Sequence, residues 1–224
     1  MNTCALEILL STACLPPVEY MAWLLFSAKA EIEMNETYPK QTWRNRYCIP
    51  SANGPLALTV PVEKPYGNHT LVHQVKISTH QNWQKQHWRT LVAAYSKSAY
   101  FVFYRELLEP FFWGKAPELL VDFNEKLLTT LILEIGIKTK PSRTLRFEKI
   151  PDGKYDLRNA ISPKAYKDLK EQENLFPAYY QPFSERFGFI LNQSIIDVLF
   201  NLGPDTLGYL GRCAKILEDQ LNPG

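Results

Sequence analysis

The stretch Leu6–Met34, LEILLSTACLPPVEYMAWLLFSAKAEIEM, decides the fold class. An apolar run over residues 6–13 predicts a buried strand, which ends at Pro16-Pro17. Proline suits the first turn of a helix, and residues 18–28 continue with good helix formers. Residues 30–34 then predict a second strand. A strand, a helix and a strand in this order predict a β-α-β unit with parallel strands.

Further strands and helices are expected in the rest of the chain. Ala52–Pro55 predicts a turn before the apolar run Leu56–Val60, and Leu71–Ser78 predicts another strand. Periodic apolar positions or capping signals predict helices over residues 83–95, 117–135, 165–173, 195–202 and 205–217. We therefore predict an α/β fold with a mixed, partly parallel sheet that starts with the β-α-β unit, and a mainly helical C-terminal part.

Length and composition fit a single globular domain. The chain has 224 residues, of which 46% are hydrophobic, enough to bury a core without disulfides or structural metals. We expect one domain over residues 1–224, with the sheet in residues 1–150 and mostly helices in residues 151–224.

Charge and cysteine usage exclude several classes of protein. The net charge of +2 is too small to argue for nucleic acid binding. The 4 cysteines form no CxxC pair and lie near no histidine at zinc spacing, so no metal site is expected. No run reaches the roughly 20 apolar residues that span a bilayer, and no basic residue precedes the first apolar run as in a signal peptide. These features predict a cytoplasmic protein with free thiols.

A polar and aromatic segment follows the second predicted strand. Residues 33–46, EMNETYPKQTWRNR, combine fixed charges with planar aromatic rings, as a site for a hydroxyl-rich or anionic ligand needs. In open α/β sheets, ligands bind beyond the carboxyl ends of the strands, where this segment lies. The alternative is a solvated hairpin with surface ion pairs. The side chains expected to bind substrate here are Glu36, Lys40, Gln41, Arg44, Asn45 and Arg46.

Three residues are candidates for proton transfer. Glu33 ends the second strand and Glu36 lies just past it, and either is suited to act as a base or to hold a sugar hydroxyl, unless it pairs with Lys40 or Arg44. His87 is suited to carry a proton near neutral pH, or alternatively packs as a core histidine on the apolar face of its helix. Arg44 and Arg46 would point the same way on a strand and clamp a carboxylate or phosphate, an inference that holds only if the segment is regular.

Five blocks of the sequence resemble the WbqC-like family of bacterial proteins. They are LPPVEYMAWL, ETYPKQTWRNR followed by LALTVPV, NWQKQHWRTLVAAYSKSAYFVFY, LRNAISPK and YYQPFSERFGFILNQSIIDVLFNLGP, in this order over nearly the whole chain. The matched blocks also contain the remaining residues that we expect to bind substrate, which are Arg89, Tyr95, Gln181 and Asn201.

The resemblance implies work in bacterial surface-polysaccharide or O-antigen biosynthesis. The expected reaction is the transfer of an acyl or aminoacyl group onto an amino sugar or nucleotide sugar, with a sugar nucleotide or acyl donor as the small-molecule partner. The alternative is a non-catalytic protein of the same pathway that binds a sugar nucleotide or another enzyme. There is no P-loop, G-x-S-x-G elbow or dinucleotide fingerprint, so the sequence names no cofactor. It leaves the oligomeric state open.

Overall fold

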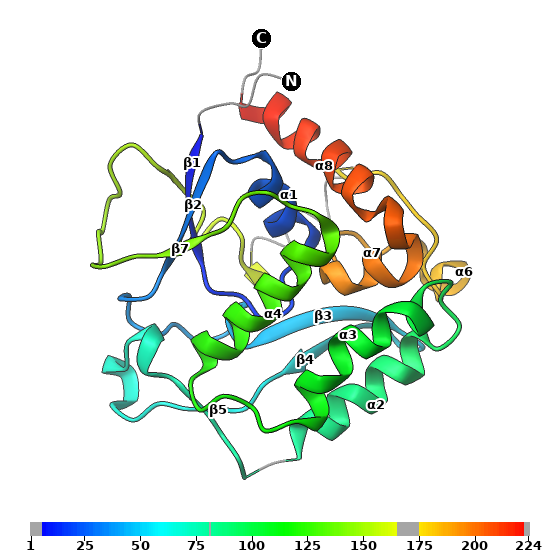
Figure 1. Cartoon of the computed structure of the whole chain (residues 1–224), viewed down its shortest axis with the longest axis horizontal. Helices are drawn as coiled ribbons and strands as arrows, with labels where there is room; N and C mark the ends of the chain where they lie inside the picture. Colours follow the sequence, from blue (N-terminus) through cyan, green and yellow to red (C-terminus); the bar gives the residue numbers. More distant parts are fainter. Residues whose placement is uncertain (1–5, 81, 165–174, 222–224) are drawn as a thin grey trace.

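The predicted β-α-β unit forms the centre of the structure (Figure 1). The computed structural model describes residues 6–80, 82–164 and 175–221. Strand β1 (Glu7–Ser11), helix α1 (Val18–Phe26) and strand β2 (Lys29–Glu33) follow one another, and β1 pairs with β2 in parallel. The pairing sets Leu9 beside Glu31 and Ser11 beside Glu33, so the carboxyl ends of the two strands coincide.

Two very short strands extend this sheet on both sides. Strand β7 (Ser142–Arg143) pairs in parallel with β2, and β8 (Tyr155–Asp156) pairs in parallel with β1. The order of the four-stranded sheet is therefore β7-β2-β1-β8. Together with the antiparallel hairpins and the C-terminal helices, this sheet confirms the predicted fold class.

The two faces of the sheet differ sharply in polarity. Side chains alternate along a strand, so Ile8, Leu10 and Ile32 point to one face and are buried in the main core. The opposite face, which we call the polar face, carries Glu7, Leu9, Ser11, Lys29, Glu31 and Glu33. The chain between β7 and β8 and just after it meets the polar face through ion pairs of Lys154 with Glu31 and of Arg158 with Glu33.

Two antiparallel hairpins follow β2 in the chain. Strand β3 (Arg46–Ser51) pairs with β4 (Gly54–Thr59), and Gly54 takes a φ of +94° in the turn, which only glycine adopts readily. The predicted turn and the strand after it are thus confirmed. Strand β5 (Val62–Glu63) pairs with β6 (Lys76–Ile77).

The predicted strand over Leu71–Ser78 is mostly wrong. Only Lys76–Ile77 (β6) forms a strand, and Val72–Gln74 forms a 3-10 turn, η2. The side chain of Gln74 accepts a hydrogen bond from the Leu71 amide at 3.1 Å, and the Gln74 amide donates to the Leu71 carbonyl at 2.9 Å. This local bonding closes the chain into a turn and outweighs the apolar alternation.

The helices largely follow their apolar patterns. The remaining elements are η1 (Gly67–His69), α2 (Trp83–Tyr95), α3 (Phe101–Trp113), α4 (Leu120–Ile135), α6 (Ser184–Phe187), α7 (Ile195–Leu202), η3 (Gly203–Asp205) and α8 (Thr206–Leu221). Helix α4 starts three residues later than Pro117, where we expected it, and ends at Gly136, whose φ is +84°. The helix expected over residues 165–173 lies outside the described residues.

The C-terminal helices pack beside α1 rather than on the sheet (Figure 1). Ser194 precedes α7, but its hydroxyl donates a hydrogen bond to the Leu15 carbonyl at 2.8 Å instead of capping the helix. Helix α7 therefore braces the loop after β1. None of the helices in the described part of the chain is long and apolar enough to cross a membrane.

Candidate functional site

The candidate site lies where β1 and β2 end on the polar face. Ser11 and Glu33 are register partners there, and the chain turns away immediately after each of them. The loop after β1 has a strained backbone, since Leu15 has a φ of +42°, which is costly for a residue with a side chain. Such a conformation persists only when the surrounding structure imposes it. The amide of Ile195 fixes this loop by donating to the Pro16 carbonyl at 2.8 Å.

A first buried arginine, Arg158, pairs with Glu33. Its Nη1 lies 3.3 Å from Glu33 Oε2, and Asp156 accepts two further bonds from its Nε and Nη2 at 2.9 and 2.7 Å. The second carboxylate oxygen of Glu33 accepts from the Asn35 amide at 2.7 Å and from the Thr144 hydroxyl at 3.0 Å. Glu33 is only 1% exposed. Its carboxylate is therefore fully engaged, which suits a positioning residue better than a base.

A second buried arginine, Arg44, lies beside the first. Its Nη2 donates to the Ser11 hydroxyl at 2.6 Å and forms an ion pair with Glu36. The Ser11 hydroxyl in turn donates to the backbone carbonyl of Arg158 at 3.1 Å, so one serine connects the two arginines. Asn124 on α4 holds the Arg44 backbone by donating to its carbonyl at 2.7 Å. The guanidinium is thus fixed in place before any ligand arrives.

One hydrogen-bond donor of Arg44 is not used. Its Nε is buried and has no hydrogen-bond partner among the described residues. Arg44 also lines a cavity of about 10 Å³, together with Ser11, Thr12, Tyr20 and Trp43 among others. That volume holds about one water-sized group. A buried donor without an acceptor costs free energy, and one oxygen of an anionic ligand would remove that cost.

A larger cleft runs along the polar face next to this cavity. Its volume is about 420 Å³, within the range of small-molecule sites. The charged residues that line it are Glu31, Glu33, Arg143, Arg146, Glu148 and Lys154. Ser11 lines the cavity and its register partner Glu33 lines the cleft. The cavity and the cleft therefore lie at the ends of two neighbouring strands. Together they offer a small anion pocket beside room for a polar ligand.

The other predicted binding residues of this segment are spread more widely. Glu36 joins Arg44, and its side chain is 14% exposed. Lys40 and Gln41 lie on the surface. Asn45 donates to the Val60 carbonyl at 2.8 Å, which ties the segment to the end of the β3–β4 hairpin.

The premise that put Arg44 and Arg46 on one strand face does not hold. Strand β3 begins at Arg46, so Arg44 lies in the irregular segment before it. Arg44 turns inward to Ser11, whereas Nε of Arg46 lies 3.3 Å from the Thr59 hydroxyl on the hairpin. The two guanidinium groups therefore have different surroundings, and Arg44 is the one that the structure brings to the strand ends.

His87 lies in an aromatic part of the core. Its ring is 5.1 Å from that of Trp83 and 5.5 Å from that of Tyr47, measured between centroids, and the Tyr47 hydroxyl is 3.1 Å from its Nδ1. Burial lowers the pKa of His87 to about 4, and a hydrogen bond to the Thr59 backbone offsets part of this shift. No contact recorded within the described ranges joins it to Glu33 or Arg44. These contacts favour the interpretation as a packed core histidine.

The lowered pKa of His87 should make stability depend on pH. The folded protein takes up the His87 proton near pH 4 and the unfolded chain near pH 6.5, so the contribution of His87 to stability falls as pH drops between these values. Buried Glu19 and Asp197, whose pKa values are raised to about 7 and about 6, act in the opposite direction, so the test is a difference. Between pH 7 and pH 5 the wild type should lose about 2 kcal/mol relative to His87→Gln, measured by urea unfolding. The control is His80→Gln, whose side chain is 85% exposed, and which should keep the wild-type dependence. Equal pH dependence in wild type and His87→Gln would refute this assignment.

Most of the remaining predicted residues surround Asp197 instead. Gln181 Nε2 donates to Asp197 Oδ2 at 2.8 Å, and Asn201 donates to the Asp197 carbonyl at 2.8 Å. Tyr95 is fully buried and packs on Phe200 with 4.9 Å between ring centroids. Burial raises the pKa of Asp197 to about 6. This network joins α7 to the segment before it and supports the loop after β1 indirectly, through Ser194.

Arg89 stays apart from both clusters, because it is exposed on α2. Sequence reasoning missed the most connected residue of the site, Arg158. Its one signal was its place in the LRNAISPK block. Ser11 and Asn124 gave no signal, since a serine at a strand end and an asparagine in an apolar helix are both ordinary. Within residues 6–80, 82–164 and 175–221, no three His, Cys, Asp or Glu side chains converge as a metal site would require.

Comparison with known proteins identifies the family of this chain. A model of the WbqC-like protein family matches residues 12–169, a range that contains Glu33, Arg44 and Arg158. The chain is similar to a protein of Mycobacterium tuberculosis (strain ATCC 25618 / H37Rv) named "Uncharacterized protein Rv1507c", with 27% identity over 199 residues, 80% of this chain and 85% of the relative. No solved structure matches. The family match covers well over half of the sequence, and the chain belongs to the WbqC-like protein family.

Proposed function

We propose that this protein is a cytoplasmic transferase of bacterial surface-polysaccharide (O-antigen) biosynthesis, which moves an acyl or aminoacyl group onto an amino sugar or nucleotide sugar. The pathway rests on what the family resemblance implies. The observation that carries a small-molecule site is Arg44, a buried residue that lines a cavity at the ends of two parallel strands and whose Nε has no partner among the described residues. Such a group suits a carboxylate or phosphoryl oxygen.

The residues divide the work as follows. Arg44 binds the anionic part of the donor, and the cleft on the polar face takes the acceptor sugar. The acceptor amine attacks the acyl carbonyl carbon, a C–N bond forms, and the bond from that carbon to the leaving group breaks, with its electron pair going to the leaving group. Glu36, a carboxylate that remains partly exposed, takes the amine proton. Through Ser11, the Glu33–Arg158 ion pair positions Arg44 and the Glu36 carboxylate that is paired with it.

A thermal-shift panel of nucleotide sugars, acyl-CoAs and free amino acids tests the site. A ligand at 100 times its dissociation constant adds about 2.7 kcal/mol, which should raise Tm by roughly 5–10 °C for a chain of this size. The variant Glu36→Gln should bind the same ligand about tenfold more tightly, because it removes a negative charge beside Arg44. Its rate of transfer to an amino sugar should fall at least a hundredfold, since the base is lost.

The matched control for this variant is Glu63→Gln, whose side chain is half exposed and whose recorded ion pair is with His80. It should change neither binding nor transfer. If no class of ligand shifts Tm, the small-molecule site is refuted. If Glu36→Gln transfers at the wild-type rate, Glu36 is not the base.

One observation favours a second candidate, a non-catalytic protein that binds a sugar nucleotide or another enzyme of the pathway. Both carboxylates at the strand ends are paired with arginines, and His87 lies in the core. A ligand that binds tightly, with no product detected by mass spectrometry across the donor and acceptor panel, would support this candidate over the transferase.

A further inference from the structure

The segment between β7 and β8, residues 144–154, exposes large apolar side chains. We call it the β7–β8 loop, and it projects from the body at the left of Figure 1 in yellow-green. Leu145 is 98% exposed and Ile150 is 85% exposed. Exposed apolar side chains are normally scattered singly over a protein surface, whereas here two aliphatic side chains in one projecting loop are almost fully exposed to solvent.

The same region carries a concentration of positive charge. Residues 138–154 contain six lysines and arginines against two acidic residues, although the whole chain has a net charge of only +2. Arg143, Arg146 and Lys154 form ion pairs, whereas Lys138, Lys140 and Lys149 have none recorded among the described residues. Lys138, Lys140, Arg146 and Lys149 are all exposed. Exposed cations that flank exposed aliphatic side chains match the two layers of an anionic bilayer surface, its charged headgroups and the hydrocarbon beneath them.

We propose that the β7–β8 loop docks the protein on an anionic lipid membrane, with Leu145 and Ile150 entering the interface and Arg146 and Lys149 meeting lipid phosphates. A nucleic acid partner would favour aromatic rings for stacking, and the two most exposed side chains here are aliphatic. The apolar contact and the charge contact are both needed, because one weak membrane signal alone gives only marginal binding.

Docking would bring the membrane close to the candidate site. The Phe147 ring lies under the guanidinium of Arg158, 5.3 Å from ring centroid to Cζ, and the Lys149 carbonyl accepts from Arg158 at 3.3 Å. Thr144 at the start of the loop donates to Glu33. The loop is thus both the exposed apolar surface and one wall of the site, which suits a ligand carried at the membrane surface. The docking itself does not depend on the proposed transferase function.

Vesicle flotation of the full chain tests the proposal. Wild type should float with vesicles of phosphatidylcholine and phosphatidylglycerol at low salt, and much less with phosphatidylcholine alone. The double variant Leu145→Ser/Ile150→Ser should lower the partition coefficient at least tenfold, and Arg146→Gln/Lys149→Gln about tenfold. Tm should not change in the first variant, because its side chains are almost fully exposed.

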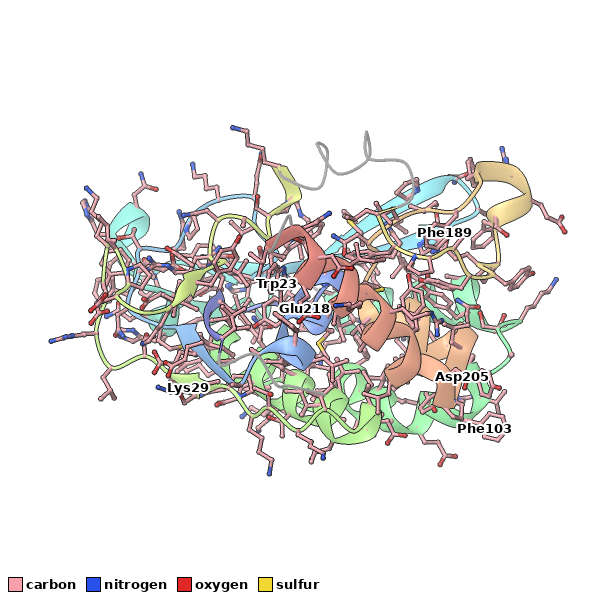
Figure 2. All side chains as sticks on the ribbon, turned by 90° about the horizontal axis from the view of Figure 1, so that it is seen from above. Trp23, Lys29, Phe103, Phe189, Asp205 and Glu218 are labelled. Atoms are coloured by element: carbon pink, nitrogen blue, oxygen red, sulfur yellow. The ribbon has the colours of Figure 1, made fainter. Side chains whose placement is uncertain are left out.

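The matched control is Val102→Ser/Phe103→Ser on α3, which removes two other apolar side chains, 67% and 75% exposed. Phe103 lies at the right of Figure 2, whereas Lys29, on the strand β2 that pairs with β7, lies at the left. This variant should float like wild type. The proposal is overturned if wild type does not bind anionic vesicles, or if the control loses as much binding as the loop variant. It is also overturned if the loop variant changes only the oligomeric state, since the surface would then contact a second copy.

Discussion

Arg158→Met should lower the free energy of unfolding by about 3–5 kcal/mol, because it leaves the Glu33 carboxylate buried without its cation. Glu33 is 1% exposed and Arg158 5%, so water cannot replace the lost partner without disturbing the strand end. For a protein of this length the loss corresponds to a fall in Tm of roughly 10 °C, measured by calorimetry.

A second variant separates the lost ion pair from lost packing. Glu33→Gln/Arg158→Met removes both charges and should recover at least half of the lost stability, since removing both partners of a buried pair is often nearly neutral. The control is Arg146→Met, whose side chain is 84% exposed and which should change stability by less than about 0.5 kcal/mol. A double variant no more stable than Arg158→Met would show that packing of the arginine, and not its charge, is what matters.

Arg44→Lys should weaken binding of the anionic ligand about a hundredfold while the protein stays folded. Lysine keeps the positive charge, but its single ammonium group cannot bond Ser11 and Glu36 and also replace the donor at Nε, which has no partner among the described residues. Calorimetric titration with the ligand found in the thermal-shift panel measures the effect. The result expected is a large rise in Kd with little change in Tm.

Arg46→Lys is the matched control for this substitution. Arg46 lies two residues further on, and its recorded hydrogen bond is to Thr59 at 3.3 Å on the hairpin. It should bind the ligand as tightly as wild type. Equal losses in both variants would mean that the two arginines act together, as a clamp on one face would, and would contradict the separate surroundings described here.

The sequence predicted the centre of the fold because local signals agree there. Between Leu6 and Met34 the apolar runs, the Pro16-Pro17 break and the helix-forming residues all indicate the same elements, and the structure confirms them. Leu71–Ser78 failed because the Gln74 side chain offers the backbone a competing turn. The single-domain description over residues 1–224 stays a prediction.

The site was harder to predict because its partners are far apart in the chain. Glu36 and Arg44 are eight positions apart, and both were expected in the site. Glu33 and Arg158 are 125 positions apart and meet because β8, a strand of only two residues, pairs with β1. So short a strand leaves no alternating pattern to detect. His87 lies on the apolar face of its helix, where either a core residue or a site residue can lie. The apolar periodicity alone does not distinguish these two roles.

The shortness of β7 and β8 also bears on how a ligand enters. Each is two residues long, so few ladder hydrogen bonds join either edge to the longer strands β1 and β2. Segments with few such bonds detach at a lower free energy than the whole molecule unfolds. We therefore expect this wall of the site to open as a small cooperative unit while the central strands stay paired, and we expect a ligand to reach the buried arginines through such a partial opening.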